Sequence, residues 1–206
     1  MKYEDWEPLY HEICAYFSFD PDDDQRAAEI ASQLSRSDAS DQFIRLIRDQ
    51  PVTVCGNAPC LKDELGRING VIIAADAAAA VLLSHGIRPD VIVTDLDGID
   101  DYAIGLNQDG TILVVHAHGD NIPRLQSWIP RITGPLLLTT QGRPFAHIHN
   151  YGGFSDGDRA VFMAEECGAK TVTLIGFDCD DPLVLPVKRG KLVWARKLLA
   201  IIGYDC

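Results

Sequence analysis

Residues 90–101 read DVIVTDLDGIDD, a short apolar run at 91–94 followed directly by a cluster of carboxylates. Comparable apolar runs recur along the chain at 52–55 (VTVC), 71–75 (VIIAA), 111–116 (TILVVH), 135–140 (PLLLTT) and 171–176 (TVTLIG). Continuous apolar runs of this length are typical of strands buried on both faces, in a parallel sheet that helices cover. We therefore predict an α/β fold with a doubly wound, mostly parallel sheet.

The first fifty residues have a different, helical pattern. Between Trp6 and Phe17 the apolar residues recur three and four positions apart, which places them on one face of a helix. Asp20 followed by Pro21 and three further acids is typical of a second helix start, and a third apolar stripe precedes the first strand. We predict a helical N-terminal extension over 1–50, without obvious chemistry, and an α/β catalytic domain over 51–206.

The composition excludes several classes of protein. Of 206 residues 47% are hydrophobic, and 18 basic residues against 30 acidic ones give a net charge of −12. A chain this acidic lacks the cationic surface that non-specific nucleic-acid or anionic-membrane binding needs. The sequence starts with acidic rather than basic residues, and its longest apolar run, 71–83, is interrupted by Asp76. We expect a cytoplasmic protein with no nucleic-acid or membrane partner.

The cysteines and histidines carry weaker signals. The six cysteines stand at positions 14, 55, 60, 167, 179 and 206. They form no C-x-x-C pair, and a chain with its own core needs no disulfide framework, so we expect buried free thiols in a reducing compartment. Two H-x-H pairs, at 116–118 and 147–149, lack the thiolates or H-E-x-x-H helix that would favour zinc.

The carboxylates after the predicted strands indicate a metal site. Asp95 and Asp97 stand one residue apart, so in an extended segment both side chains would face one ion. Asp76 and Asp120 follow neighbouring strands, and the carboxyl ends of parallel strands meet at one edge of the sheet. Carboxylate oxygens suit Mg²⁺, which completes its shell with water and substrate phosphates. The alternative is a solvated acidic loop.

Two further positions suit a phosphate ligand. Gly56 and Asn57 follow the first strand in a turn that we expect to open a helix, where free amides and the helix dipole favour an anion. An ordinary strand-to-helix turn explains the same residues. Lys191 lies in the last predicted helix, where it either reaches a phosphate or belongs to a solvated face.

The segment YGGFSDGDR at 151–159 has two interpretations. Ser155 followed three residues later by Asp158 is typical of a capping box at a helix start. The segment also suits a ligand, because glycine permits close backbone approach, an aromatic ring can stack and arginine pairs with phosphate. The substrate-binding candidates are Gly153, Phe154, Ser155, Asp156, Asp158 and Arg159.

Several motifs in order resemble a known family. They are IAAD (73–76), TDLDG (94–98), HAHGDN (116–121), GGFSDGDRA (152–160), LIGFD (174–178) and KLVWA (191–195). The chain resembles the thiamine pyrophosphokinase catalytic core, and more closely the archaeal 6-hydroxymethyl-7,8-dihydropterin pyrophosphokinases. The resemblance covers residues 51–200 and implies a Rossmann-like core. The family usually has glycine where this chain has Ala77, and a methyl group there could crowd a ligand or forbid a turn with positive φ.

The resemblance also implies an activity. Mg²⁺ held by Asp76, Asp95, Asp97 and Asp120 would gather around ATP, with the last three residues taking part in catalysis. The family transfers a diphosphate from ATP to the pterin hydroxymethyl group and leaves AMP, in pterin biosynthesis of the methanopterin or folate type. The ATP contacts would come from Gly56, Asn57 and Lys191, and the pterin contacts from the segment 153–159.

Two other functions stay open from the sequence alone. One is a metal-dependent sugar-nucleotide transferase, which would release a nucleoside diphosphate. The other is a non-catalytic nucleotide-binding module that binds Mg–ATP without turnover. The apolar stripe of the first helix also suggests a homodimer.

Overall fold

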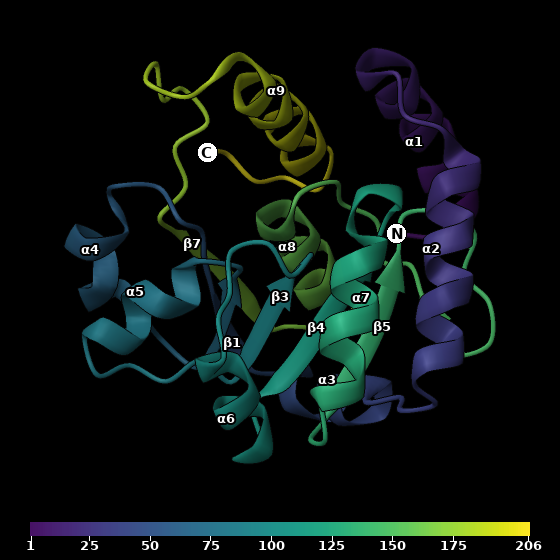
Figure 1. Ribbon diagram of the computed structural model, residues 1–206. Coiled ribbons are helices and arrows are strands. Elements are labelled where there is room, and N and C mark those ends of the chain that lie inside the picture. The colour runs from purple at the N-terminus through teal and green to yellow at the C-terminus, as the bar shows by residue number, and fades with distance from the viewer.

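A computed structural model describes residues 1–206, and its centre is a sheet of seven strands that all run parallel (Figure 1). The strands are β1 Pro51–Cys55, β2 Val71–Ala75, β3 Val91–Thr94, β4 Ile112–Ala117, β5 Leu136–Thr140, β6 Ile148–His149 and β7 Thr171–Ile175. Their order is β6-β5-β4-β3-β2-β1-β7, so the direction of the winding reverses between β1 and β7. The six strands expected from the apolar runs are confirmed. Only β6, two residues long, was not predicted.

Helices cover both faces of the sheet. They are α1 Tyr3–Phe17, α2 Pro21–Leu34, α3 Ser40–Ile47, α4 Leu61–Glu64, α5 Ala78–Ser84, α6 Tyr102–Gln108, α7 Ile122–Trp128, α8 Asp156–Glu166 and α9 Pro186–Ile201. Short 3₁₀ turns follow at η1 Leu65–Arg67, η2 Gly119–Asn121 and η3 Ile129–Arg131. Successive strand residues serve opposite faces, since Ile92 belongs to one apolar cluster and Val93 to the other. Burial of both faces explains the continuous apolar runs.

The N-terminal helices pack into the α/β domain. Helix α2 begins after Asp20, whose side chain accepts a hydrogen bond from the Asp22 amide as expected. Ala28 of α2 lies in the core on one face of the sheet, and Phe43 of α3 lies in the core on the other. A third apolar cluster joins α1, α8 and α9 beyond the carboxyl ends of the strands (Figure 1). The extension therefore forms part of the wall around that edge.

The cysteines differ from the sequence-based expectation. Cys179 and Cys206 form a disulfide, with Cα atoms 5.5 Å apart, whereas the other four are free thiols. The chain after α9 turns back toward the loop that follows β7, where Arg196 pairs with Asp180 and donates to the Cys206 carbonyl. The expectation of six free thiols was wrong because this return of the chain has no signal in cysteine spacing. No helix of the structure is long and apolar enough to cross a membrane.

Candidate active site

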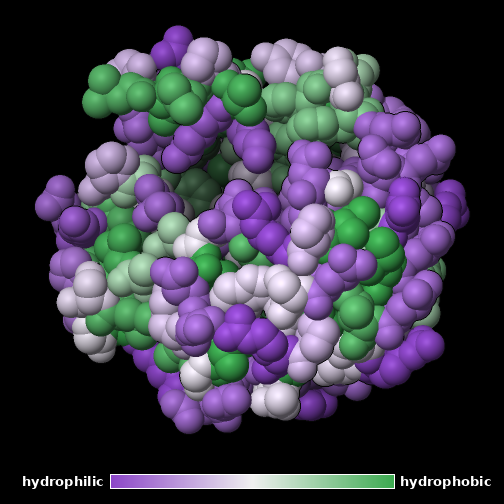
Figure 2. Space-filling view, viewed as in Figure 1, coloured by the Kyte–Doolittle hydropathy of each residue, from purple (hydrophilic) through white to green (hydrophobic).

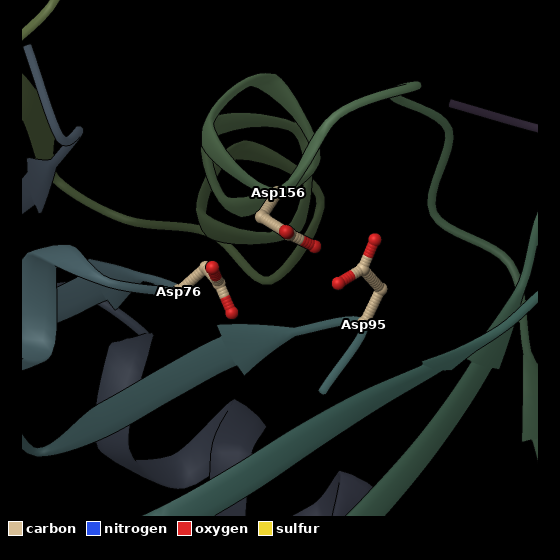
Figure 3. A group of neighbouring side chains, drawn as sticks. All are labelled: Asp76, Asp95 and Asp156. Atoms are coloured by element: carbon tan, nitrogen blue, oxygen red, sulfur yellow. The ribbon is translucent and has the colours of Figure 1, made fainter. Parts of the chain in front are cut away.

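Three carboxylates converge at the carboxyl edge of the sheet. Asp76 follows β2, Asp95 follows β3 and Asp156 opens α8, and each offers an oxygen within 4.8 Å of the others' (Figure 3). All three side chains point toward one another and are half-buried. We call this set the carboxylate group. Oxygen ligands at this spacing can hold one hard divalent cation such as Mg²⁺.

The backbone around Asp76 is shaped to present its carboxylate. Asp76 has a positive φ of 49°, and its amide donates to the Val93 carbonyl at 2.8 Å. The Thr94 hydroxyl donates to its Oδ1 at 2.6 Å, and the Gly98 amide reaches the same oxygen at 3.3 Å. A Cβ at Gly98 would lie 1.7 Å from Asp76 Oδ2, so only glycine leaves room for the carboxylate. Backbone strain held by such contacts is typical of functional sites.

The loop after β3 is a turn and not the extended segment that we expected. Leu96 has a φ of 73° and is buried, and its amide donates to the Thr94 hydroxyl oxygen at 2.8 Å. The Asp97 amide bonds to Asp95 Oδ1 at 3.2 Å, which folds the D-x-D segment on itself. In this turn the Leu96 side chain lies in the core, and Asp95 and Asp97 do not share one face as they would in an extended strand. Asp97 is exposed and lies outside the carboxylate group.

Helix α8 fixes Asp156 through its own first turn. The capping box is confirmed, because the amides of Phe154 and Ser155 donate to the Asp158 carboxylate at 2.6 and 2.8 Å. Arg159, 4% exposed, donates to Asp156 Oδ1 at 3.0 Å and to the Phe154 carbonyl at 2.8 Å. Asp158 is fully buried and lines neither cavity described below, so its geometry supports a capping role and not the substrate contact that we predicted.

Gly153 also serves the fold of this segment. It has a φ of 85°, and a Cβ there would lie 2.4 Å from the Arg159 Cα. The glycine thus permits the segment to approach α8 closely, and it lines neither cavity. The predicted contact between Gly153 and a ligand is not supported by this arrangement.

The negative charge of the site is only partly balanced. Burial raises the pKa of Asp156 well above its ordinary value, although the Arg159 guanidinium opposes this shift. Burial likewise raises the pKa of Asp76, and partial burial with the adjacent Asp95 charge raises the pKa of Asp97 to about 6. Burial also disfavours ionised Asp95, but its hydrogen bonds to His118 and Asp97 hold its pKa below the usual range. A bound cation would supply the missing positive charge.

Two cavities flank the carboxylate group. The wide cavity, about 270 Å³, lies between the turns after β1 and β7 and helix α9, and its lining includes Gly56, Asn57, Asp76, Ala77, Phe177, Val184, Lys188 and Leu192. The polar cavity, about 80 Å³, is lined by Phe19, Asp95, His116, His118, Asp120, Gln141, Phe154, Ser155, Asp156, Arg159 and Lys191. Ser155 and Asp156 border both. Figure 2 shows the surface hollowed beneath α9, with a partly hydrophobic floor.

The predicted phosphate-binding residues therefore fall in different cavities. Gly56 and Asn57 line the wide cavity, whereas Lys191 lines the polar one. Helix α4, which we expected to open directly at the Gly56 turn, begins only at Leu61 and is a single turn, so the turn gains little from a helix dipole. Ala77 has a φ of −60°, a conformation that any residue adopts, so its methyl group does not forbid the turn.

Asp120 and Asp156 do not lie where the sequence predicted. Asp120, predicted as a metal ligand, is exposed on η2 at the border of the polar cavity and lies outside the carboxylate group. Asp156, predicted as a substrate contact, is inside that group. Its position depends on the packing of α8 against β1, β2 and β3, which residue spacing does not reveal.

Two further candidates line the site: His118, which the sequence offered only as part of an H-x-H pair for zinc, and Phe19, which the sequence did not single out. His118 Nε2 lies 3.4 Å from Asp95 Oδ2, and Phe19 of the extension reaches the polar cavity. The position of His118 directly after β4 was the available signal, since residues at strand ends face the site. Phe19 stands between two helices, and nothing in its sequence surroundings distinguishes it from a core residue.

Comparison with known proteins identifies the family of this chain. The family model described as "6-hydroxymethylpterin diphosphokinase MptE-like" matches residues 26–182. The chain belongs to this MptE-like family. The match spans all three members of the carboxylate group and both flanking turns.

Three curated relatives carry the name 6-hydroxymethyl-7,8-dihydropterin pyrophosphokinase. The protein from Pyrococcus furiosus is 42% identical over 86% of this MptE-like chain and 78% of its own length. Those from Methanothermobacter thermautotrophicus and Methanocaldococcus jannaschii are each 34% identical, over 97% and 86% of this chain and 94% and 80% of theirs.

One solved structure shows a more distant likeness. It is the MAf glycosyltransferase from Magnetospirillum magneticum AMB-1, with 18% identity and a TM-score of 0.45. The match covers 76% of this MptE-like chain and 29% of that one. A likeness at this level carries no argument about function.

Proposed function

We propose that this protein transfers the terminal diphosphate of ATP to the hydroxymethyl group of 6-hydroxymethyl-7,8-dihydropterin. The hydroxymethyl oxygen bonds to the β-phosphorus, the bond from that phosphorus to the oxygen bridging the α-phosphorus breaks, and AMP leaves with that oxygen. The hydroxyl proton passes to solvent. The relatives' names support the pterin acceptor and the diphosphate group.

The carboxylate group between two cavities is the observation that carries this proposal. A diphosphate transfer joins two substrates through a highly charged centre, and it depends mainly on positioning and on neutralising charge. The two cavities share Asp156 and so offer one place for each substrate on either side of the acids. We propose that the nucleotide occupies the wide cavity, at the reversal of strand order between β1 and β7.

The residues present fit Mg²⁺. The donors are hard carboxylate oxygens, and the raised pKa values of Asp76 and Asp156 indicate negative charge that the protein leaves unbalanced. Bound Mg²⁺ would supply positive charge that neutralises the phosphates during transfer. The protein's own part is orientation, because Arg159 holds Asp156, Thr94 holds Asp76 and His118 holds Asp95. Lys188 and Lys191 add cations beside the two cavities.

A product assay tests this function. Purified protein is incubated with MgCl₂ and ATP, with either the hydroxymethyldihydropterin or thiamine as acceptor, and nucleotides are separated by chromatography. We expect AMP only with the pterin. Asp156→Asn should lower AMP formation at least a hundredfold, since it removes a shared ligand of the charged centre.

Asp41→Asn is the matched control for that variant. Asp41 is exposed near the start of α3 and lines neither cavity, so this change should leave the rate within twofold. ATP unchanged with either acceptor, from folded protein, would contradict the proposed function. Binding of Mg–ATP without turnover would then favour a nucleotide-binding module.

A further inference from the structure

The polar cavity contains a buried histidine nitrogen without a partner. His116 is 2% exposed, and its Nδ1 lies 3.0 Å from the Thr139 hydroxyl oxygen. Its Nε2 makes no hydrogen bond, although a buried polar atom normally has one. Because the ring lines the polar cavity, a ligand there can supply the missing partner.

The side-chain oxygen of Gln141, which lines the same cavity, also has no hydrogen-bond partner. Gln141 Nε2 donates to Asp24 Oδ2 at 2.8 Å, and the Tyr10 hydroxyl donates to the same oxygen. A carboxylate that accepts these bonds fixes the amide with its nitrogen toward Asp24, so the amide oxygen points elsewhere. That oxygen takes part in none of the structure's hydrogen bonds, and Gln141 lines the polar cavity.

An aromatic ring from the N-terminal extension borders the same space. Phe19 stacks on Phe17 with ring centroids 5.3 Å apart and is half-buried. It lines both the polar cavity and an adjoining cavity of about 180 Å³ that opens over the start of α2. A flat heterocycle can therefore extend from His116 along Phe19 into the adjoining cavity.

The lining of the adjoining cavity disfavours a triphosphate and suits an uncharged ring. The adjoining cavity is walled by Asp20, Asp23, Asp24 and Asp120, which would repel a triphosphate. An uncharged pterin carries ring N–H and amino donors together with a carbonyl and ring-nitrogen acceptors, which match the Gln141 oxygen and the His116 nitrogen. The wide cavity is also bordered by acids, among them Asp178 and Asp181, but with about 270 Å³, Lys188 and apolar walls it suits the larger nucleotide better.

We propose that the polar cavity and its extension bind the pterin ring, with Phe19 as its stacking partner and His116 and Gln141 as its hydrogen-bonding partners. This inference rests on the proposed function and assigns its acceptor to one side of the carboxylate group. It gives the N-terminal extension a part in substrate binding. In this position the hydroxymethyl group points toward Asp95 and Asp156, which line the same cavity.

Binding measured without turnover tests the assignment. Full-length protein is titrated calorimetrically with the hydroxymethyldihydropterin, in the presence of Mg²⁺ and α,β-methylene-ATP, and separately with the Mg–nucleotide alone. Phe19→Ala should raise the Kd for the pterin roughly tenfold and leave the nucleotide Kd within twofold. Tyr16→Ala is the matched control, because Tyr16 is 60% exposed and lines none of these cavities.

A second variant, His116→Phe, tests the buried part of the proposed pterin site. His116→Phe keeps a ring of similar size and removes both nitrogens, and we expect a roughly fivefold rise in the pterin Kd. If neither variant weakens pterin binding, the proposed pterin site is wrong. AMP formation by the wild-type protein would in that case still support the proposed function. A loss of nucleotide affinity instead would reverse the assignment of the cavities. Wild-type protein that binds no pterin would overturn both proposals.

Discussion

The interior of the sheet and its carboxyl edge are built in opposite ways, although only a few residues separate them. Ile73, Ile92 and Leu113 are fully buried in apolar surroundings. At the edge, Asp76 and Leu96 have positive φ and three carboxylates face one another. The interior stabilises the fold, whereas the edge holds backbone strain and like charges that Arg159 only partly balances. Stability and function should therefore respond to different substitutions.

The largest effect should come from Asp76→Asn, which we expect to lower activity and raise stability at the same time. We expect a loss of AMP formation of roughly a thousandfold, because one carboxylate of the charged centre is removed. The metal-free protein should nevertheless melt at a higher temperature. Asparagine removes a charge that burial disfavours, and its amide oxygen can still accept from Thr94 and Gly98. Steady-state rates and thermal melts in EDTA measure the two effects, and a lower melting temperature would contradict the comparison.

A substitution in the interior should give the reverse result. Leu113→Ala should lower the free energy of unfolding by about 3 kcal/mol, because it leaves a cavity in a fully buried site. The rate per folded molecule should stay unchanged. Leu183→Ala is the control, since Leu183 is 91% exposed and should change stability by less than about 0.5 kcal/mol. Denaturant unfolding and the AMP assay measure both variants. A lower rate per folded molecule of Leu113→Ala would show that the interior also affects activity, contrary to the comparison.

The smallest expected effect is the change with pH in how much Mg²⁺ stabilises the protein. At a hundred times its Kd, Mg²⁺ should stabilise the protein by about 2.7 kcal/mol. The pKa values of Asp76, Asp97 and Asp156 are raised, with Asp97 at about 6, so these groups destabilise the metal-free fold above their folded pKa values. As the pH falls through those values the groups take up protons and the destabilisation fades, and protonation of Asp76 and Asp156 competes with Mg²⁺ binding.

The increase in melting temperature caused by Mg²⁺ should therefore be larger at pH 7.5 than at pH 5.5. His116, whose pKa burial lowers, works in the opposite direction in the metal-free protein, because its unfolded form takes up a proton as the pH falls. Taking the difference with and without Mg²⁺ at each pH removes this contribution. Melts by scanning fluorimetry at both values provide the measurement, and equal increases would count against the carboxylate group as the Mg²⁺ site.

The sequence predicts the interior better than the edge, for a physical reason. Each strand buries its own apolar residues, so a run such as 71–75 carries its signal locally. The carboxylate group instead depends on contacts between distant segments. Asp156 reaches Asp76 and Asp95 because α8 packs against the sheet, and the D-x-D segment turns at Leu96, whose side chain lies in the core. The pairing of Cys179 with Cys206 is non-local in the same way.

That disulfide changes how the wide cavity can open. Its two cysteines are 27 positions apart and enclose the whole of α9 in a covalent ring, and Cys179 itself lines the cavity. Closing a ring of this size removes roughly 3 to 4 kcal/mol of chain entropy from the unfolded state. Helix α9 cannot peel away from its C-terminal end alone. Any outward movement of α9 would therefore carry the Cys179 loop with it, because the disulfide joins the two covalently.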